Sequence, residues 1–265
     1  MTVIDLQVLG PAFIAGLLVL ATHVPLGTIV LERGIIFIDI ALAQVAATGV
    51  VFGGLMWGEV SGWIIQASAI FAALACSVML VWTDKRFPDM QEAIIGVLYV
   101  TAAAVQLMML SVNPAGSEYL KQLLIGQILW VSPMQLAGIA LVYAAVLALW
   151  HFRDLRRERM LFYGVFAIVI TISVQIVGVL LVFASLIVPA LAARAAGPRW
   201  RILIALNVGV AGYFLGLVAS ALLNLPTGAA IVCALVMMAI IVGLTLSRRK
   251  PVEETPLRSE AVPGE

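Results

Sequence analysis

The chain has 265 residues, of which 63% are hydrophobic and only 11% are charged, with a formal net charge of +1 at pH 7. Soluble domains are about 45–50% apolar and about 25% charged, so this composition excludes an ordinary soluble protein and predicts a polytopic membrane protein. The small net charge and the lack of a basic stripe argue against nucleic acid as a partner. Cys76 and Cys233 lie in apolar runs and are interpreted as core residues rather than as a disulfide or metal pair.

Apolar segments of about 20 residues, the length that crosses the hydrocarbon layer, recur along the chain. Clear spans are expected at 8–31, 35–57, 62–83, 91–112, 135–152, 200–223 and 226–247. A further apolar block, 160–194, is too long for one helix, and Gly178 and Pro189 interrupt it. The segment 123–132 is expected to be a re-entrant or interfacial helix rather than a full crossing.

The basic residues indicate how the block 160–194 is threaded, because cytoplasmic loops collect Lys and Arg. The basic segments are Glu32–Arg33, 84–89, 153–159, the arginines at 194, 199 and 201, and 247–250. All of them fall on one side only if the block crosses twice and bends near Gly178. This predicts nine crossings, with the N-terminus outside and the C-terminus inside. The alternative of eight crossings places three arginines outside.

The predicted fold class is therefore all-α: a single polytopic transmembrane helical bundle over 1–247. The polar, Pro-rich tail 248–265 is predicted to be disordered and cytoplasmic. The sequence contains no phosphate-binding loop of the form G-x-x-x-x-G-K-[ST]. The chain is therefore predicted to be a non-enzymatic subunit, and any ATP that powers it is bound by another polypeptide.

Polar groups inside the first two spans are costly and are candidates for function. A rise of about 1.5 Å per residue places His23 and Gln44 each about 15 Å from the connecting turn, with Asp39 about half as deep. In an antiparallel pair of spans, His23 and Gln44 would meet near mid-membrane. Pro25 is expected to kink the first span and to help open a polar pocket there.

His23, Asp39, Gln44 and Glu92 are the candidate ligands of a metal pathway. Imidazole suits zinc, copper, iron and nickel, whereas carboxylate and amide oxygens suit harder ions such as manganese. Each residue also has a structural interpretation: a hydrogen bond within the bundle for His23, interhelical hydrogen bonding for Gln44, and a favourable charge at a helix N-terminus for Glu92. A buried carboxylate such as Asp39 must pair, bind a proton or contact water.

Two G-x-x-x-G spacings, Gly49–Gly53 and Gly212–Gly216, allow close approach of helices. They predict tight packing either within the chain or across a dimer. Gln106, Ser173 and Gln175 are further mid-span polar residues, for which structural roles are expected.

Several stretches, in order along nearly the whole chain, resemble the metal-transporting ABC permease family, whose members import zinc, manganese or iron. They are ERGIIFIDIALAQVAATGVVFG, EAIIGVLYVTAAA, LLIGQILWVSPMQL, SVQIVGVLLVFASLIVPALAAR and LNLPTGAAIV. The resemblance implies a fold similar to the vitamin B12-type importer that lacks one N-terminal helix. It also implies a homodimer in a bacterial-type cytoplasmic (inner) membrane, an ABC ATPase dimer on the cytoplasmic face and an extracytoplasmic metal-binding protein.

The sequence differs from the family pattern in two places. Gln44 takes the position of the histidine in G-D-A-L-x-H, and Asp39 lies one position before that pattern's aspartate. The coupling stretch D-x-x-x-A-x-x-x-G is shortened, as in a variant branch, because its Ala and Gly are missing. The candidates for ATPase coupling are Arg153, Asp154, Arg156 and Arg157.

The function predicted from these features is the transmembrane permease subunit of an ABC importer, which carries zinc, manganese or iron as cargo and holds no cofactor of its own. The shortened coupling stretch motivates an alternative, an ATPase-independent metal carrier or channel derived from the same family. An integral membrane enzyme is a third class. It would need a cluster of titratable groups near one interface, where the sequence offers only Asp39 and Glu92.

Overall fold

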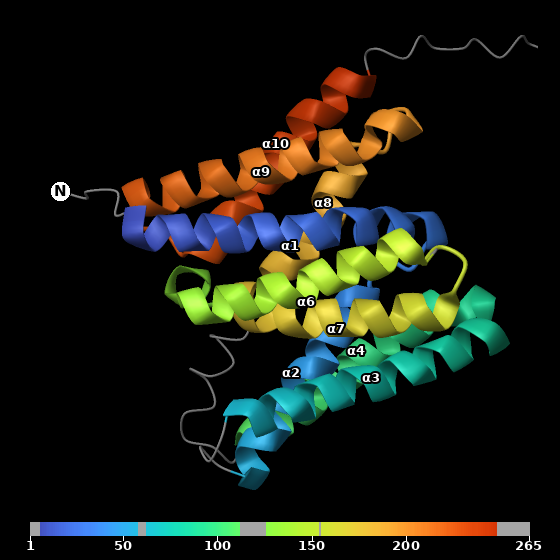
Figure 1. Ribbon diagram of the computed structural model, residues 1–265. Coiled ribbons are helices and arrows are strands. Elements are labelled where there is room, and N and C mark those ends of the chain that lie inside the picture. Colours follow the sequence, from blue (N-terminus) through green and yellow to red (C-terminus); the bar gives the residue numbers. More distant parts are fainter. Residues whose placement is uncertain (1–5, 58–61, 112–125, 154, 248–265) are drawn as a thin grey trace, which may run out of the picture.

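A computed structural model describes residues 6–57, 62–111, 126–153 and 155–247, and this part of the chain is helical with no strand. The helices are α1 (Leu6–Arg33), α2 (Ile38–Trp57), α3 (Gly62–Arg86), α4 (Gln91–Ser111), α6 (Pro133–Phe152), α7 (Arg159–Val177), α8 (Val179–Ala192), α9 (Pro198–Leu223) and α10 (Thr227–Ser247). Two 3-10 turns are η2 (Pro88–Met90) and η3 (Ile128–Trp130). Figure 1 shows them as one bundle of roughly aligned helices. The predicted all-α fold class is confirmed.

Eight of these helices are long and apolar enough to cross a membrane, and α8 is a shorter apolar helix of 14 residues. The predicted break of the block 160–194 is confirmed, because α7 ends and α8 begins at Gly178, whose φ of 79° favours glycine. The predicted spans match the helices to within a few residues. The predicted tail 248–265 lies outside the described residues.

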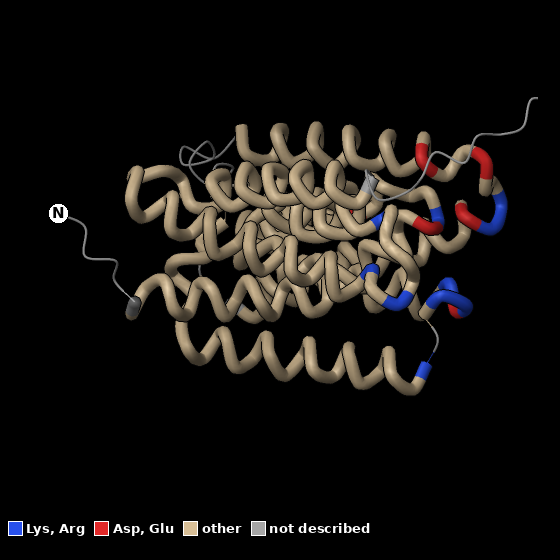
Figure 2. The backbone as a smooth tube through the Cα atoms, turned by 90° about the horizontal axis from the view of Figure 1, so that it is seen from above, with Lys and Arg blue, Asp and Glu red and all other residues tan. Residues whose placement is uncertain are grey.

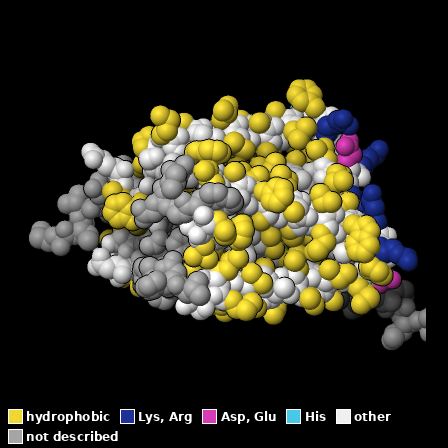
Figure 3. Space-filling view, turned by 90° about the horizontal axis from the view of Figure 1, so that it is seen from below, with side chains coloured by type: hydrophobic (Ala, Val, Ile, Leu, Met, Phe, Trp, Pro, Cys, Tyr) yellow, Lys and Arg dark blue, Asp and Glu magenta, His cyan; other side chains and the backbone are white. Residues whose placement is uncertain are grey.

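Charged residues are concentrated at one end of the bundle (Figure 2). The C-terminal end of α1, the start of α2, the connection between α6 and α7, and the start of α9 all lie at this end, which we call the charged end. Figure 3 shows apolar side chains along the length of one face and cations at its charged end. This separation is the one expected for a protein that crosses a membrane with its basic loops on one side.

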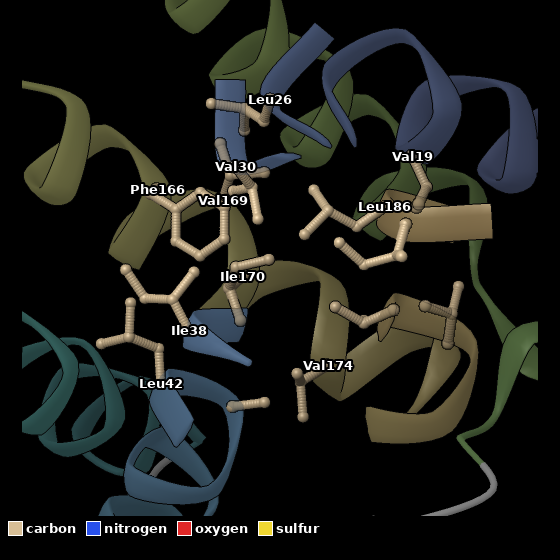
Figure 4. Close-up of a cluster of buried hydrophobic side chains, with 14 of the residues drawn as sticks. Val19, Leu26, Val30, Ile38, Leu42, Phe166, Val169, Ile170, Val174 and Leu186 are labelled. Atoms are coloured by element: carbon tan, nitrogen blue, oxygen red, sulfur yellow. The ribbon is translucent and has the colours of Figure 1, made fainter. Parts of the chain in front are cut away.

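Helix α7 separates α1 from α2. Helix α1 packs on α8, α9 and α6, whereas α2 packs on α3, α4 and α7. In Figure 4, Phe166, Val169 and Ile170 of α7 lie between the side chains of α1 and those of α2, such as Ile38 and Leu42. The expected antiparallel pairing of the first two spans is therefore wrong. The turn at Gly34, with φ of 70°, directs the chain away from α1 instead of back along it.

Hydrogen bonds between buried side chains link α7 and α8 to their neighbours. The hydroxyls of Tyr143 on α6 and Ser173 on α7 lie 2.5 Å apart, and those of Ser185 on α8 and Tyr213 on α9 lie 2.8 Å apart. In lipid, helices associate through close packing and such polar contacts rather than through the hydrophobic effect. Ser173 therefore has a structural role, as expected for a mid-span polar residue: its hydroxyl links α7 to α6.

The segment before α6 is held at the end of the bundle opposite the charged end. Gly126 has a φ of 74° and packs against the backbone of Val177, where a Cβ atom would overlap the chain. The Gln127 amide donates a hydrogen bond to the Ile176 carbonyl at 3.0 Å. The described part of 123–132 is thus a turn against the end of α7. It is not a full crossing, as predicted, but residues 126–132 contain only the short segment η3 instead of the expected helix, and 123–125 lie outside the described residues.

Both G-x-x-x-G spacings are used inside the chain. Gly49 and Gly53 face Ser68 and its neighbours on α3, and Gly212 and Gly216 face α10. Of the two alternatives left open by the sequence, the structure therefore shows intramolecular packing at both sites.

Gly27→Ala is expected to destabilise the protein, because a Cβ atom at this position would overlap the carbonyl oxygen of Leu186 on α8. Backbone cannot move aside as a side-chain tip can, so we expect a loss of about 1–3 kcal/mol. Thermal unfolding of the detergent-solubilised protein measures it. The matched control is Gly164→Ala in α7, where nothing lies within 4 Å and no loss is expected. Equal stability of both variants would contradict the close α1–α8 contact.

Candidate functional site

Asp39 and Glu92 lie next to the N-terminus of α2. Asp39 is in the first turn of α2, is fully buried, and makes no hydrogen bond through either carboxylate oxygen within the described residues. Glu92 is in the first turn of α4 and accepts a hydrogen bond from the Phe37 amide at 3.3 Å. The two carboxylates are close enough to interact electrostatically. The partial positive charge of a helix N-terminus favours acidic groups at this position.

Gln44 bridges two helices instead of meeting His23. Its Nε2 donates a hydrogen bond to Oε1 of Gln106 on α4, and both residues are buried. The Thr48 hydroxyl extends this contact toward the carbonyls of Gln44 and Ala102, at 2.8 and 3.2 Å. The interhelical role expected as one interpretation of Gln44 is therefore present. The suggested contact with His23 is absent, since α7 lies between α1 and α2.

His23 is fully buried in α1, and its ring is oriented by its own helix. Nδ1 lies 2.9 Å from the Val19 carbonyl oxygen and 3.2 Å from the Thr22 hydroxyl. Because a carbonyl can only accept, Nδ1 carries the proton, and Nε2 therefore carries the lone pair. Within the described residues Nε2 has no hydrogen-bond partner. Metal-binding histidines commonly show this arrangement, with one nitrogen bound to a carbonyl and the other available.

The four predicted ligands are thus divided among three places: His23 in α1, Asp39 with Glu92 at the charged end, and Gln44 with Gln106 between α2 and α4. Among the described residues there is no group of three or more His, Cys, Asp or Glu side chains that could hold a metal ion together.

A cavity of about 700 Å³ lies between α2, α3 and α4. Its few polar groups are hydroxyls such as those of Thr48, Ser68 and Thr101, and the rest of its lining is apolar. It contains none of the four predicted ligands. A metal ion prefers nitrogen, oxygen or thiolate ligands, so this cavity does not fit a metal.

The predicted coupling residues lie in the connection between α6 and α7, where two of them form ion pairs within the chain. Arg153 Nη1 lies 2.9 Å from Glu158 Oε1, and Arg156 Nη1 lies 3.0 Å from Glu32 Oε2 at the end of α1. Arg157 also has an interaction partner. Asp154 lies outside the described residues. The connection is therefore attached to α1 by its own charges.

The sequence interpretation missed the residues that hold this connection. The Arg33 guanidinium donates to the carbonyls of Leu155 and Arg156 at 3.3 and 3.1 Å and lies 4.2 Å from the ring centre of Phe162. In the sequence, Glu32–Arg33 indicated only the side of the membrane. The sequence signal that could have identified Glu32 and Arg33 is their position: an acidic and a basic residue side by side at the end of a span, on the same side of the membrane as the basic loop 153–159.

This bundle, apolar along its length and charged at one end, defines a multi-pass membrane transport subunit of the permease class. The sequence profile described as ABC 3 transport family matches residues 5–246. The chain belongs to this family, and the resemblance to metal-transporting ABC permeases is confirmed.

Two solved structures have a similar fold. One is PsaBC from Streptococcus pneumoniae in complex with Fab, with a TM-score of 0.73 at 20% identity over 89% of this chain and 92% of that chain. The other is described as a metal-chelate type ABC transporter in an inward-facing conformation. Its TM-score is 0.66 at 17% identity, over 90% of this chain and 85% of that chain. At these identities the likeness shows the fold alone.

The Gln44–Gln106 contact predicts a non-additive pair of substitutions. Gln44→Leu or Gln106→Leu alone leaves one buried amide without its partner, and each is expected to lower the free energy of unfolding by about 1–2 kcal/mol. The double Leu variant removes both amides and should be less destabilised than the sum of the two single variants. Thermal unfolding in detergent measures all three. Simple additivity would show that the two side chains act independently.

Proposed function

We propose that the chain is the transmembrane permease subunit of an ABC importer for a divalent metal ion, namely zinc, manganese or iron. The match to the ABC 3 transport family over residues 5–246 is the observation that carries the proposal. The polarised bundle supports it, because basic connections at one end offer a soluble partner a place to bind. ATP is hydrolysed by a separate ABC ATPase dimer at the charged end, which faces the cytoplasm.

The metal would be handed along separate polar groups rather than held in one cage. The Nε2 lone pair of His23 and the carboxylates of Asp39 and Glu92 supply nitrogen and oxygen ligands at different depths. A transport path needs contacts that are favourable enough for entry and weak enough for release. Buried ligand atoms without an internal partner meet this need, because a passing cation compensates for their lost hydration. Gln44 would join the path when its bond to Gln106 opens.

The remaining partners follow from the same proposal. Helices α4, α6 and α10 leave most of their surface uncovered by the rest of the chain, so lipid and a second copy of the subunit have large apolar surfaces to contact. The permease acts as a homodimer in a bacterial-type inner membrane. An extracytoplasmic metal-binding protein delivers the ion at the end opposite the charged one. ATP-driven alternation between outward and inward openings then moves it.

One observation favours a second candidate, an ATPase-independent metal carrier or channel. Residues 153–158, which join α6 to α7, are few, and their described part forms turns rather than a helix. A coupling helix of the length implied by the family pattern does not fit in this connection.

Copurification separates the two candidates. The tagged permease, expressed with its neighbouring genes, is expected to retain an ATPase subunit in detergent. Reconstituted into liposomes, the complex should take up metal only when ATP is present. Metal uptake by the permease alone, at the same rate as the complex, would favour the carrier.

His23→Ala and Asp39→Asn are each expected to lower metal uptake by about tenfold or more, since each removes a ligand atom from the path. Uptake of radioactive zinc or manganese by cells measures this, with membrane abundance checked by immunoblotting. Asn has nearly the same shape as Asp, so the substitution at position 39 removes the charge without changing the packing. Normal uptake by both variants would remove these residues from the path.

Charge reversal at Arg153, Arg156 and Arg157 together is expected to weaken ATPase association, because it replaces the cationic surface of the α6–α7 connection with an acidic one. The amount of ATPase retained on the tagged permease measures the effect. Retention equal to that of the wild-type protein would leave these arginines with only their role in membrane orientation.

A further inference from the structure

A polar pocket of about 290 Å³ lies at the charged end of the bundle, where α1, α8 and α9 meet. Three charged side chains line it: Glu32 from the end of α1, Arg194 just after α8, and Arg201 near the start of α9. Thr28, Leu31 and Ala190 complete its wall. None of the residues proposed for the metal path lines this pocket. Unlike the apolar cavity between α2, α3 and α4, it is lined by charged side chains.

The charges around this pocket are not balanced. The Glu32 carboxylate is shared by two guanidiniums, with Arg156 at 3.0 Å and Arg201 at 3.4 Å. The Nε atom of Arg201 is buried and has no hydrogen-bond partner within the described residues. Arg194 is exposed and forms no ion pair with any described residue. The pocket lining itself holds one carboxylate and two guanidiniums, those of Arg194 and Arg201, so its net positive charge attracts a further anion.

The available donors fit a carboxylate. A guanidinium presents parallel N–H groups that match the two oxygens of an acidic side chain. A volume of about 290 Å³ holds such a side chain together with several waters, each of which takes about 30 Å³. The guanidinium of Arg194 and the Nε–H group of Arg201 are then the hydrogen-bond donors for an acidic side chain that enters the pocket from another polypeptide.

We propose that this pocket receives an acidic side chain, Asp or Glu, of the ATPase subunit. The proposal rests on the proposed function. It is favoured over a lipid headgroup because the connection between α6 and α7 is short and two of its arginines are already paired within the chain. A soluble partner therefore needs a further anchor at this end, and Arg194 offers an unpaired cation for it.

The pocket also links the anchor to three parts of the bundle. An acid that binds Arg201 competes with Glu32, and Glu32 in turn holds Arg156 in the connection between α6 and α7. A movement of the bound ATPase would thereby change the ion pairs of α1, of α9 and of the α6–α7 connection together.

The test measures how strongly the ATPase is retained on the immobilised permease as the NaCl concentration is raised. Arg194→Glu is expected to weaken the ATPase's binding about tenfold or more, because it replaces a charge-assisted bond with repulsion. Glu32→Gln is expected to make retention more resistant to salt, because it removes the internal competitor. If Glu32 only stabilises the structure, Glu32→Gln should instead make ATPase retention more sensitive to salt, and that result would contradict the proposal.

The matched control is Lys85→Glu, which makes the same change in charge at the charged end but on α3, away from the pocket. It should leave retention unchanged, and a loss equal to that of Arg194→Glu would overturn the pocket in favour of general electrostatics. Full retention by Arg194→Glu would also overturn it, as would a loss of bound anionic lipid, seen by native mass spectrometry, without loss of ATPase. If the wild-type permease retains no ATPase, the proposed function itself fails.

Discussion

The packing of α7 between α1 and α2 is the contact on which the rest of the bundle depends. The aromatic and branched side chains of α7 fill the space between the two helices, so that the chain divides into α1 with α8, α9 and α10 on one side and α2 with α3 and α4 on the other. In lipid no hydrophobic force draws helices together, and stability comes from close contact and interhelical hydrogen bonds. Glycines where backbones approach, and hydroxyl pairs such as Tyr143–Ser173, supply both.

The polar groups of the interior fall into two kinds. The hydroxyls form two hydrogen-bonded pairs, Tyr143 with Ser173 and Ser185 with Tyr213, and the amide of Gln44 is bonded to Gln106 on α4. By contrast, the oxygens of Asp39 and the Nε2 atom of His23 are buried without an internal partner. A buried polar group without a partner costs free energy, so its retention calls for an explanation outside the packing of the chain. Under the proposed function, a passing cation would be the missing partner of these atoms.

The helices could be predicted closely from the sequence, because spans of about 20 apolar residues and one-sided basic loops are strong local signals. Even the break at Gly178 followed from counting arginines. The neighbours of each helix could not be predicted in this way. The short turn at Gly34 suggested a hairpin, but its positive φ sends α2 to the far side of α7. Gln44 was therefore assigned the wrong partner, although its tendency to bridge helices was predicted.

The attachment of the turn at Gly126–Gln127 to the last residues of α7 has a mechanical consequence. This helix begins beside the charged connection that Arg33 and Glu32 hold, and it ends where the backbone of Ile176 binds the segment before α6. A helix resists compression along its axis, so α7 acts as a strut between the two faces of the membrane. A displacement of its first turn at the charged end would therefore be carried along the helix axis to the segment before α6 at the opposite end.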